Sequence, residues 1–313
     1  MMDKRAVKLV PAFKDYLWGG NKLKRDYNKK SDLDIVAESW ELSTHKDGQS
    51  MVEGTGITLG EYIEKQGEEV LGKNARAFEF FPILIKFIDA KGSLSVQVHP
   101  TDEYALKVEG EYGKTEMWYI LDCDEGASLY YGLNREMTKE EFKKHIEDDT
   151  ILEILNKVEV KKGDVFFIEA GTIHAIGAGI VICEIQQNSN TTYRVYDYNR
   201  RDKDGNLREL HIEKAIDVSN LYPAPPIKRL SDADDLLLAE CKYFTVRALK
   251  VSGEKKVKIT DDCFNSLIIT EGEGTLVLNG EVLKLKKGDS IFIPAQCAEY
   301  KLTGEMDVIL SYV

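Results

Sequence analysis

The chain has 313 residues, with 42 Lys and Arg residues against 54 Asp and Glu residues, and its formal net charge at pH 7 is −12. This excess of acidic residues argues against a dedicated nucleic-acid-binding protein, whose affinity depends on basic side chains that neutralise phosphates. Hydrophobic residues make up 43% of the chain and charged residues 31%, which excludes a largely disordered polymer and predicts one large domain or two smaller ones.

The amino terminus and the cysteines predict a cytoplasmic protein. The first eight residues are charged, and no apolar run of signal-peptide length follows them. The longest apolar stretch, residues 80–88, is interrupted by Lys86 and is much shorter than the about 20 apolar residues that a membrane helix needs. The five cysteines contain no Cys-x-x-Cys pair, so reduced thiols are expected. We therefore expect no export and no membrane partner.

The first elements along the chain are a helix and a group of strands. Thr58 and Glu61 have the spacing of a capping box, apolar residues follow at roughly helical spacing, and Gly72 supplies a stop signal. Short β-branched and aromatic runs, separated by Gly and Asp, then predict strands. These runs cover residues 83–88, 117–121 and 128–131.

A second capping box, Thr138 with Glu141, begins the next predicted helix. Strands are expected at residues 165–168 and 193–198, a third helix over the apolar stripe of residues 210–216, and several further strands after residue 243. Strands of this length and frequency predict a mainly β protein, either a sandwich or a barrel.

A proline-rich segment divides the chain. Three of the seven prolines fall within residues 222–226, and such a segment neither continues a helix nor donates to a sheet. We expect an amino-terminal domain of residues 1–222, a linker at 223–226 and a carboxy-terminal domain of residues 227–313. All five histidines precede the linker, so a histidine-bearing site belongs to the first domain.

One segment of the sequence occurs twice. Residues 161–170 and 286–295 agree at Lys, Gly, Asp, Phe, Ile and Ala without a gap. Each copy is typical of a Gly-Asp turn that leads into a buried strand. The same displacement pairs His174 with Glu299, so the second copy lacks the histidine that follows the strand in the first. We infer a duplicated unit of which only one copy can hold a metal ion.

Four residues near these strands have the chemistry of metal ligands. Gln97 and His99 are two positions apart on a strand-like stretch, so their side chains point to one face. Glu116 begins the strand predicted next along the chain, and His174 follows the strand at residues 165–168. Two imidazoles, one carboxylate and one amide oxygen favour Zn²⁺ over Ca²⁺. Spacing alone leaves open that Gln97 and His99 are ordinary hydrogen-bonding residues near a turn.

The repeated segment resembles a motif of the cupin superfamily. Residues 163–174 match the second cupin motif, except that Glu169 stands where a proline is usual. Residues 97–116 similarly resemble the first motif, with Gln97 in place of the first histidine and an insertion before the glutamate. The resemblance implies two double-stranded β-helix barrels with a few added helices, of which the first binds metal and the second does not.

Six motifs in chain order narrow the resemblance to the type I mannose-6-phosphate isomerases, in their short bacterial form, over essentially the whole chain. They are residues 16–20 (YLWGG), 37–41 (AESWE), 86–90 (KFIDA), 94–100 (LSVQVHP), 114–119 (KTEMWY) and 170–175 (AGTIHA).

The resemblance implies a ligand set and an active site. One Zn²⁺ per chain is expected on Gln97, His99, Glu116 and His174. Substrate-binding roles are implied for Ser95, Lys114 and Arg194, and catalytic roles for Lys114, Glu184 and Arg194. The segment between His174 and Glu184 is one residue longer than the family pattern, a departure that bears on the assignment of Glu184. A solvated turn lysine at Lys114 and a solvent-facing carboxylate at Glu184 are the alternatives to be tested.

The implied reaction is the interconversion of mannose 6-phosphate and fructose 6-phosphate, by ring opening and proton transfer between C1 and C2 through a cis-enediol. The expected partner is a small sugar phosphate rather than a nucleic acid or a membrane, and the sequence does not indicate an oligomeric state. Two other functions remain open. One is a different metal-dependent cupin enzyme, such as another sugar-phosphate isomerase or an iron oxygenase. The other is a sugar-binding or regulatory module that has kept the ligand set and lost the base.

Overall fold

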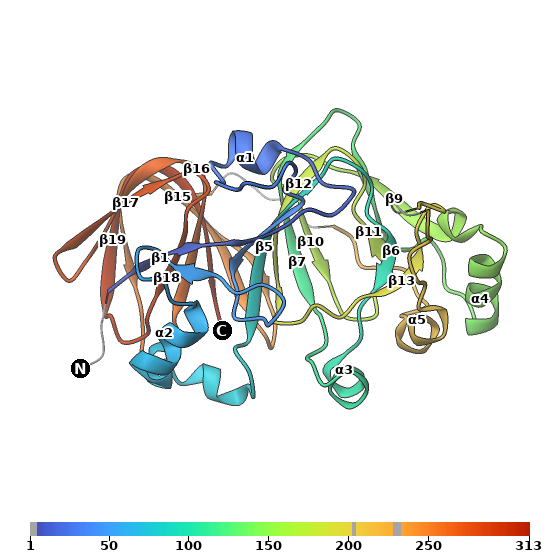
Figure 1. Ribbon diagram of the computed structural model, residues 1–313, viewed down its shortest axis with the longest axis horizontal. Helices are drawn as coiled ribbons and strands as arrows, with labels where there is room; N and C mark the ends of the chain where they lie inside the picture. The colour runs from blue at the N-terminus through green and yellow to red at the C-terminus, as the bar shows by residue number, and fades with distance from the viewer. Residues whose placement is uncertain (1–4, 202–204, 228–232) are drawn as a thin grey trace.

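The computed structural model describes residues 5–201, 205–227 and 233–313. The described chain is mainly β, with three antiparallel sheets of six, five and eight strands and short helices at the periphery (Figure 1). In these residues we find no helix with the length and apolarity required to cross a membrane.

The six-stranded and five-stranded sheets form what we call the first barrel. Apolar side chains of both sheets pack into one buried core, with Ile88 and Trp118 from one sheet and Leu129 and Tyr131 from the other. In pairing order the larger sheet contains β10 (Val165–Ile168), β7 (Glu116–Cys123), β12 (Ile180–Gln187), β5 (Ile83–Ala90), β3 (Glu38–Leu42) and β2 (Ala12–Lys14). The smaller contains β13 (Tyr193–Tyr196), β6 (Val96–Val98), β11 (His174–Ala175), β8 (Ser128–Leu133) and β9 (Leu155–Glu159).

The eight-stranded sheet surrounds a separate apolar core that includes Leu267, Leu302 and Val308, and we call it the second barrel. Its strands in pairing order are β14 (Asp235–Glu240), β15 (Thr245–Lys258), β19 (Glu299–Tyr312), β16 (Asn265–Leu278), β18 (Ser290–Ile293), β1 (Val7–Val10) and β4 (Met51–Val52), and β17 (Glu281–Lys286) pairs with β16.

The five α-helices of the described residues lie outside the sheets (Figure 1). Their bounds are α1 (Lys22–Asp26), α2 (Leu59–Gln66), α3 (Asp102–Val108), α4 (Lys139–Glu147) and α5 (Ile212–Val218), and three 3₁₀ turns cover Glu68–Leu71, Asn74–Ala77 and Ile151–Ile154. Both predicted capping boxes are present, at the first turns of α2 and α4.

Most of the predicted elements are confirmed, and two end earlier than expected. Helix α2 stops at Gln66 rather than near Gly72, because Gly67 adopts a φ of +90° that breaks the helix before a short 3₁₀ turn. Strand β13 ends at Tyr196 rather than at residue 198, because Tyr198 and Asn199 have positive φ angles that are incompatible with an extended strand.

The repeated segments form the same structure twice. Lys161 and Lys286 each donate their backbone N–H to the aspartate three residues later, at 2.9 Å in both copies. From the strands that follow, β10 and β18, five neighbouring strands run in equivalent order in the two sheets, β10-β7-β12-β5-β3 and β18-β16-β19-β15-β14. This agreement of strand order is what a duplicated unit predicts.

The expected division at residues 223–226 does not coincide with a division between the sheets. Val7 in β1 pairs with Phe292 in β18, and β4 pairs with β1, so two amino-terminal strands complete the sheet of the second barrel. A single apolar cluster also joins Phe87 of the first barrel to Phe264 and Phe292 of the second. Strand pairing is not limited to neighbours in sequence, so the proline segment at 223–226 stays a predicted boundary of the chain and not of the sheets. Residues 228–232, at the start of the expected second domain, lie outside the described residues.

Candidate active site

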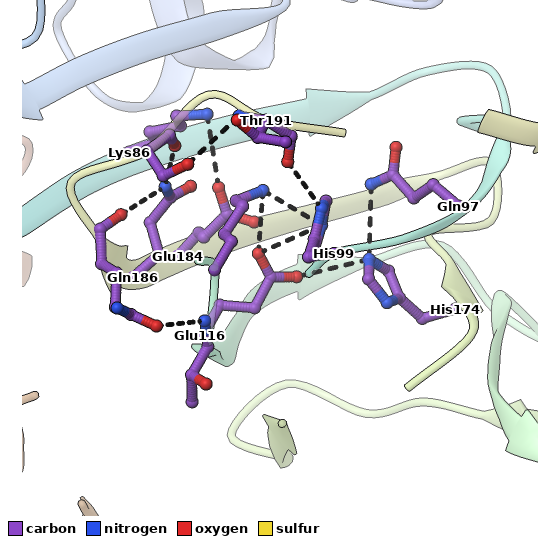
Figure 2. Close-up of polar contacts among 12 residues, drawn as sticks. Lys86, Gln97, His99, Glu116, His174, Glu184, Gln186 and Thr191 are labelled. Carbon is purple, nitrogen blue, oxygen red and sulfur yellow. Dashed lines mark hydrogen bonds and ion pairs between the residues drawn. The ribbon is translucent and has the colours of Figure 1, made fainter. Parts of the chain in front are cut away.

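Three of the four predicted ligands meet in a buried cluster at one end of the first barrel. His174 lies in β11 directly beside Gln97 of β6, while Glu116 begins β7. His99, which follows β6, turns its ring toward His174, with ring centroids 4.8 Å apart. One ligand atom from each of His99, Glu116 and His174 lies within 4.8 Å of the other two (Figure 2). The strand pairing therefore brings together residues that are far apart in the sequence.

Backbone carbonyls orient both imidazole rings. Nδ1 of His99 is 3.0 Å from the carbonyl oxygen of Thr191, and Nδ1 of His174 is 2.9 Å from that of Thr172. Since a carbonyl only accepts, Nδ1 carries the proton in both rings and the lone pair of Nε2 is available to a metal. Burial lowers the pKa of His174 to about 4 and that of His99 well below its ordinary value, so both rings are neutral.

Glu116 shows that these residues fit a cation. Its side chain is fully buried, and apart from the ammonium group of Lys114, 2.9 Å from Oε2, no donor reaches either carboxylate oxygen within the described residues. The oxygens instead face Nε2 of His99 at 3.6 Å and Nε2 of His174 at 3.4 Å. Burial raises the pKa of this carboxyl above its ordinary value, because the loss of hydration outweighs the nearby ammonium of Lys114. A divalent ion among these atoms would satisfy the carboxylate and both lone pairs.

Gln97 lies beside the same cluster, with its amide nitrogen Nε2 at 3.4 Å from Nε2 of His174. A half-turn of the amide about its last bond would exchange the nitrogen for the oxygen, which is the atom that a metal binds. The four predicted ligands are therefore close neighbours, although the cluster of titratable ligands contains only three of them.

Lys114 is buried against the cluster. Its Nζ atom lies 2.9 Å from an oxygen of Glu116 and 3.2 Å from Nε2 of His99, so an ammonium group already contacts two of the proposed ligand atoms. Burial lowers the pKa of Lys114, but Glu116 and Glu184 raise it by more, and the net pKa is above its ordinary value. The alternative of a solvated turn lysine is therefore wrong.

A cavity of about 270 Å³ opens beside these residues and contains the other predicted site residues. Its lining includes Ser95, Gln97, Lys114, Glu184 and Arg194. The structure thus brings every residue that the sequence assigned to substrate or catalysis into one cavity, next to the buried ligands.

Glu184 is buried in β12 and points into this region, which rules out a solvent-facing carboxylate. Its Oε1 accepts a hydrogen bond from Nε1 of Trp118 at 3.0 Å, while Oε2 accepts none. Burial raises the pKa of Glu184, but Lys114 and Lys86 outweigh it, and the pKa lies below its ordinary value. The carboxylate is therefore ionised, with one oxygen free to take a proton.

Arg194 is the other predicted cation of the cavity. It pairs with Gln97 across β13 and β6, and its guanidinium donates to the carbonyl oxygen of Glu209 at 2.7 Å. Its Nε–H is buried and has no acceptor. This nitrogen is a donor that an anionic substrate can satisfy.

Three further charged residues line the cavity, Glu38, Lys86 and Arg208, and none of them was predicted from the sequence to belong to the site. Glu38 and Lys86 occur within the family motifs at residues 37–41 and 86–90, and a lysine inside the otherwise apolar start of β5 was a usable signal. No motif or periodicity near Arg208 pointed to the site. Its side chain lies at the cavity with its Nε–H donating to Oδ2 of Asp197 at 2.7 Å. The remaining histidines, His45, His145 and His211, lie outside the cavity lining, although His45 is buried.

Comparison with known proteins agrees with this geometry. The family profile "Phosphomannose isomerase type I, catalytic domain" matches residues 6–127, and the profile "Mannose-6-phosphate isomerase, cupin domain" matches residues 235–313. The chain is 41% identical over 312 residues to mannose-6-phosphate isomerase ManA of Bacillus subtilis, covering 97% of each chain. It is 37% identical over 303 residues to a mannose-6-phosphate isomerase of Streptococcus mutans, covering 95% of this chain and 94% of the relative.

Solved structures show the same relationship. The crystal structure of a mannose 6-phosphate isomerase from Bacillus subtilis superposes with a TM-score of 0.88 at 33% sequence identity, and the match covers 98% of this chain and 99% of the other. The similarity extends over both barrels and both profiles. This chain therefore belongs to the type I phosphomannose isomerase family.

Proposed function

We propose that this protein binds one Zn²⁺ ion through Gln97, His99, Glu116 and His174 and interconverts mannose 6-phosphate and fructose 6-phosphate. The observation that carries the proposal is the meeting, at one cavity, of a buried donor cluster with the ionised carboxylate of Glu184 and two cations, Lys114 and Arg194. The relatives named above are described as mannose-6-phosphate isomerases.

A bound divalent ion supplies electrophilic stabilisation of the substrate oxygens on which negative charge develops. The donor set favours Zn²⁺, because two imidazole nitrogens are softer ligands than the all-oxygen sets of Ca²⁺ and Mg²⁺ sites.

Glu184 is the proposed base. In the open-chain aldose it takes the proton from C2, the C1–C2 double bond of a cis-enediol forms, and the electron pair of the carbonyl goes to the oxygen on C1. The hydroxyl proton on the C2 oxygen then passes to the oxygen on C1, the carbonyl re-forms at C2, and the C1–C2 electron pair takes the proton back from Glu184 at C1, which gives the ketose. Glu184 lines the cavity, and because the hydrogen bond from Trp118 occupies Oε1, Oε2 is the proposed basic atom.

Cations in the cavity offset the charge of the substrate. Lys114 and Arg194 are proposed to stabilise the enediolate or hold the phosphate, and the hydroxyl of Ser95 to bind a sugar oxygen. The net charge of −12 does not oppose this, since charges are screened beyond about 8 Å at physiological salt and the local cations dominate. We also place the activity in the cytoplasm, because a dianionic sugar phosphate does not cross a membrane unaided.

The test is an isomerase assay that detects fructose 6-phosphate formed from mannose 6-phosphate, combined with metal analysis of the same sample. Chelation should abolish the rate, and Zn²⁺ should restore it. Recovery with Fe²⁺ and uptake of oxygen would favour the oxygenase alternative. Binding of mannose 6-phosphate by the metal-loaded protein, without turnover, would favour a sugar-binding module.

A further inference from the structure

The second barrel has a cavity of its own, of about 390 Å³. It is larger than the cavity of the proposed active site, and it is lined by residues of β14, β15, β16 and β19 together with the segment between β15 and β16. Six of its lining residues are compared below with positions of the first barrel: Asp235, Arg247, Leu249, Lys258, Thr260 and Asn265.

Strand register shows that this cavity occupies the place of the active site in the duplicated unit. In the first barrel the pairing runs from Phe166 to Trp118, Glu184 and Lys86 across four neighbouring strands. In the second it runs from Ile291, the repeat partner of Phe166, to Leu267, Leu310 and Arg247. Arg247 therefore stands where Lys86 stands in the first barrel, and Leu310 replaces Glu184.

The next strand extends the correspondence. Glu38 pairs with Ile88 in the first barrel, as Asp235 pairs with Leu249 in the second. The ion pair between Lys86 and Glu38, at 3.6 Å, has its counterpart between Arg247 and Asp235 at 2.6 Å. The second cavity has thus kept a basic and an acidic residue at equivalent positions.

In the second barrel, the positions equivalent to the proposed metal ligands carry other residues. Glu116 opposes Ile168, and Asn265 opposes Ile293, so an amide replaces the carboxylate. His174 opposes Gln97, and Glu299 opposes Lys258, so a cation stands in place of the neutral amide. Thr260 follows Lys258 as His99 follows Gln97, so the histidine is also gone.

What remains is a positively charged cavity. Its lining contains four cations, Arg247, Lys255, Lys256 and Lys258, against the single carboxylate of Asp235. Lys258 forms no ion pair within the described part of the chain, whereas Lys256 is 3.5 Å from Glu299. In a chain with a net charge of −12, this local excess of positive charge favours the binding of an anion.

We propose that the second barrel binds a small phosphate-bearing anion in this cavity without a metal ion. A guanidinium and several ammonium groups suit the charge and the several acceptor oxygens of a phosphate dianion. The site does not isomerise its ligand, because the positions of Glu184 and of the metal ligands carry other residues. The proposal does not depend on the isomerase activity of the first barrel.

Cys263 provides a direct test, because it lines this cavity and is partly exposed. In the full-length, metal-loaded protein, the rate at which iodoacetamide alkylates Cys263 is followed by peptide mass spectrometry, with and without inorganic phosphate. At a phosphate concentration about ten times its Kd, bound phosphate should slow the alkylation of Cys263 about tenfold. Cys123 and Cys241, which do not line the cavity, serve as internal references.

Three variants test whether the protection of Cys263 arises from phosphate bound in this cavity. Arg247→Gln should abolish the protection, and so should Lys258→Gln, which alters an exposed residue and leaves the fold intact. Lys301→Gln, on the same barrel but outside the cavity lining, should keep it. A parallel series with glucose 6-phosphate distinguishes a phosphate ester from inorganic phosphate as the preferred form. Absence of protection by both, or equal protection by chloride at the same ionic strength, would overturn the proposal.

Discussion

Glu184 and Lys86 lie opposite each other on the adjacent strands β12 and β5, with Oε2 of Glu184 3.6 Å from Nζ of Lys86. The same ammonium lies 3.6 Å from Glu38 and over the ring of Trp40. Both partners are buried, so the carboxylate remains ionised through a nearby cation rather than through water (Figure 2). The pairing supplies a base in its active protonation state beside the donor cluster.

The first prediction concerns this base. Glu184→Gln keeps the size of the side chain and an oxygen for the hydrogen bond from Trp118, but it removes the basic carboxylate. The rate should fall by about 10² to 10⁴, the usual contribution of a positioned general base. This corresponds to about 2.7 to 5.4 kcal/mol at about 1.36 kcal/mol per decade. Steady-state kinetics and zinc content must be measured on one sample.

The matched control is Glu159→Gln, which removes an exposed carboxylate on β9 of the same barrel and should leave the rate unchanged. Wild-type turnover in Glu184→Gln with zinc intact would remove this residue from the mechanism. The neutral form of Lys114 would then be the next candidate for the base.

The second prediction concerns the metal. The wild-type protein should carry about one divalent ion per chain, and His99→Ala or His174→Ala should lose most of it, because three remaining ligands hold zinc poorly. Metal analysis after dialysis measures this directly. His145→Ala, which changes a histidine of α4 that contacts Thr150 at 2.8 Å, is the control and should keep its metal. Full occupancy in both site variants would place the metal elsewhere.

The third prediction concerns the second barrel. A chain that ends after Pro226 lacks β18, the partner of β1, and removes Phe264 and Phe292 from the apolar cluster that also contains Phe87. The exposed apolar surface should cause aggregation, to be seen by sedimentation and by loss of activity from the soluble fraction. The full-length Pro225→Ala variant should remain soluble. A truncated chain that is monodisperse and fully active would show that the second barrel is dispensable.

The fourth prediction is a pH dependence of stability. Burial raises the pKa of Asp197, but the guanidinium groups of Arg208 and Arg200 outweigh it and hold the pKa below its ordinary value. Because the pKa is depressed in the folded state, the contribution of Asp197 is present at neutral pH and is lost as the pH falls below about 4. Asp197→Asn should cost about 1 to 3 kcal/mol near neutral pH and much less in acid.

Urea unfolding at the two pH values measures this difference between Asp197→Asn and the wild type. Asp217→Asn, at an exposed position of α5, should change the free energy of unfolding by less than about 0.5 kcal/mol at either pH. If Asp197→Asn lowers the free energy of unfolding by the same amount at both pH values, the ionised state assigned to Asp197 is wrong.

The fifth prediction compares the two copies of the repeat. Gly163 and Gly288 have φ angles of +91° and +89°, so alanine at either position is strained by about 1 to 2 kcal/mol. A Cβ atom at Gly288 would also lie 2.0 Å from the carbonyl oxygen of Tyr27, whereas at Gly163 its nearest neighbour is 4.0 Å away. Gly288→Ala should therefore cost a further about 1 to 3 kcal/mol in unfolding experiments. Equal losses of unfolding free energy in the two variants would show that the backbone near Tyr27 moves away from the new Cβ atom at little cost.

Local signals predicted much of this structure. The capping boxes at Thr58 and Thr138 and the Gly-Asp turns of the repeat depend on residues within a few positions of one another, so their conformations can be inferred from the sequence. The alternation of Gln97 and His99 and the position of His174 after the repeated segment suggested a ligand set, and the family resemblance was needed to select it from the alternatives.

The sequence by itself determined the mainly β class, the duplication and the residue types available for chemistry. Only the tertiary structure decided that β1 joins the second barrel, that Lys86 and Arg208 reach the cavity, and that the second copy keeps a cavity lined by Arg247. The physical reason is strand register: hydrogen bonds between segments far apart in the chain decide which side chains share a face, and no local propensity specifies that pairing.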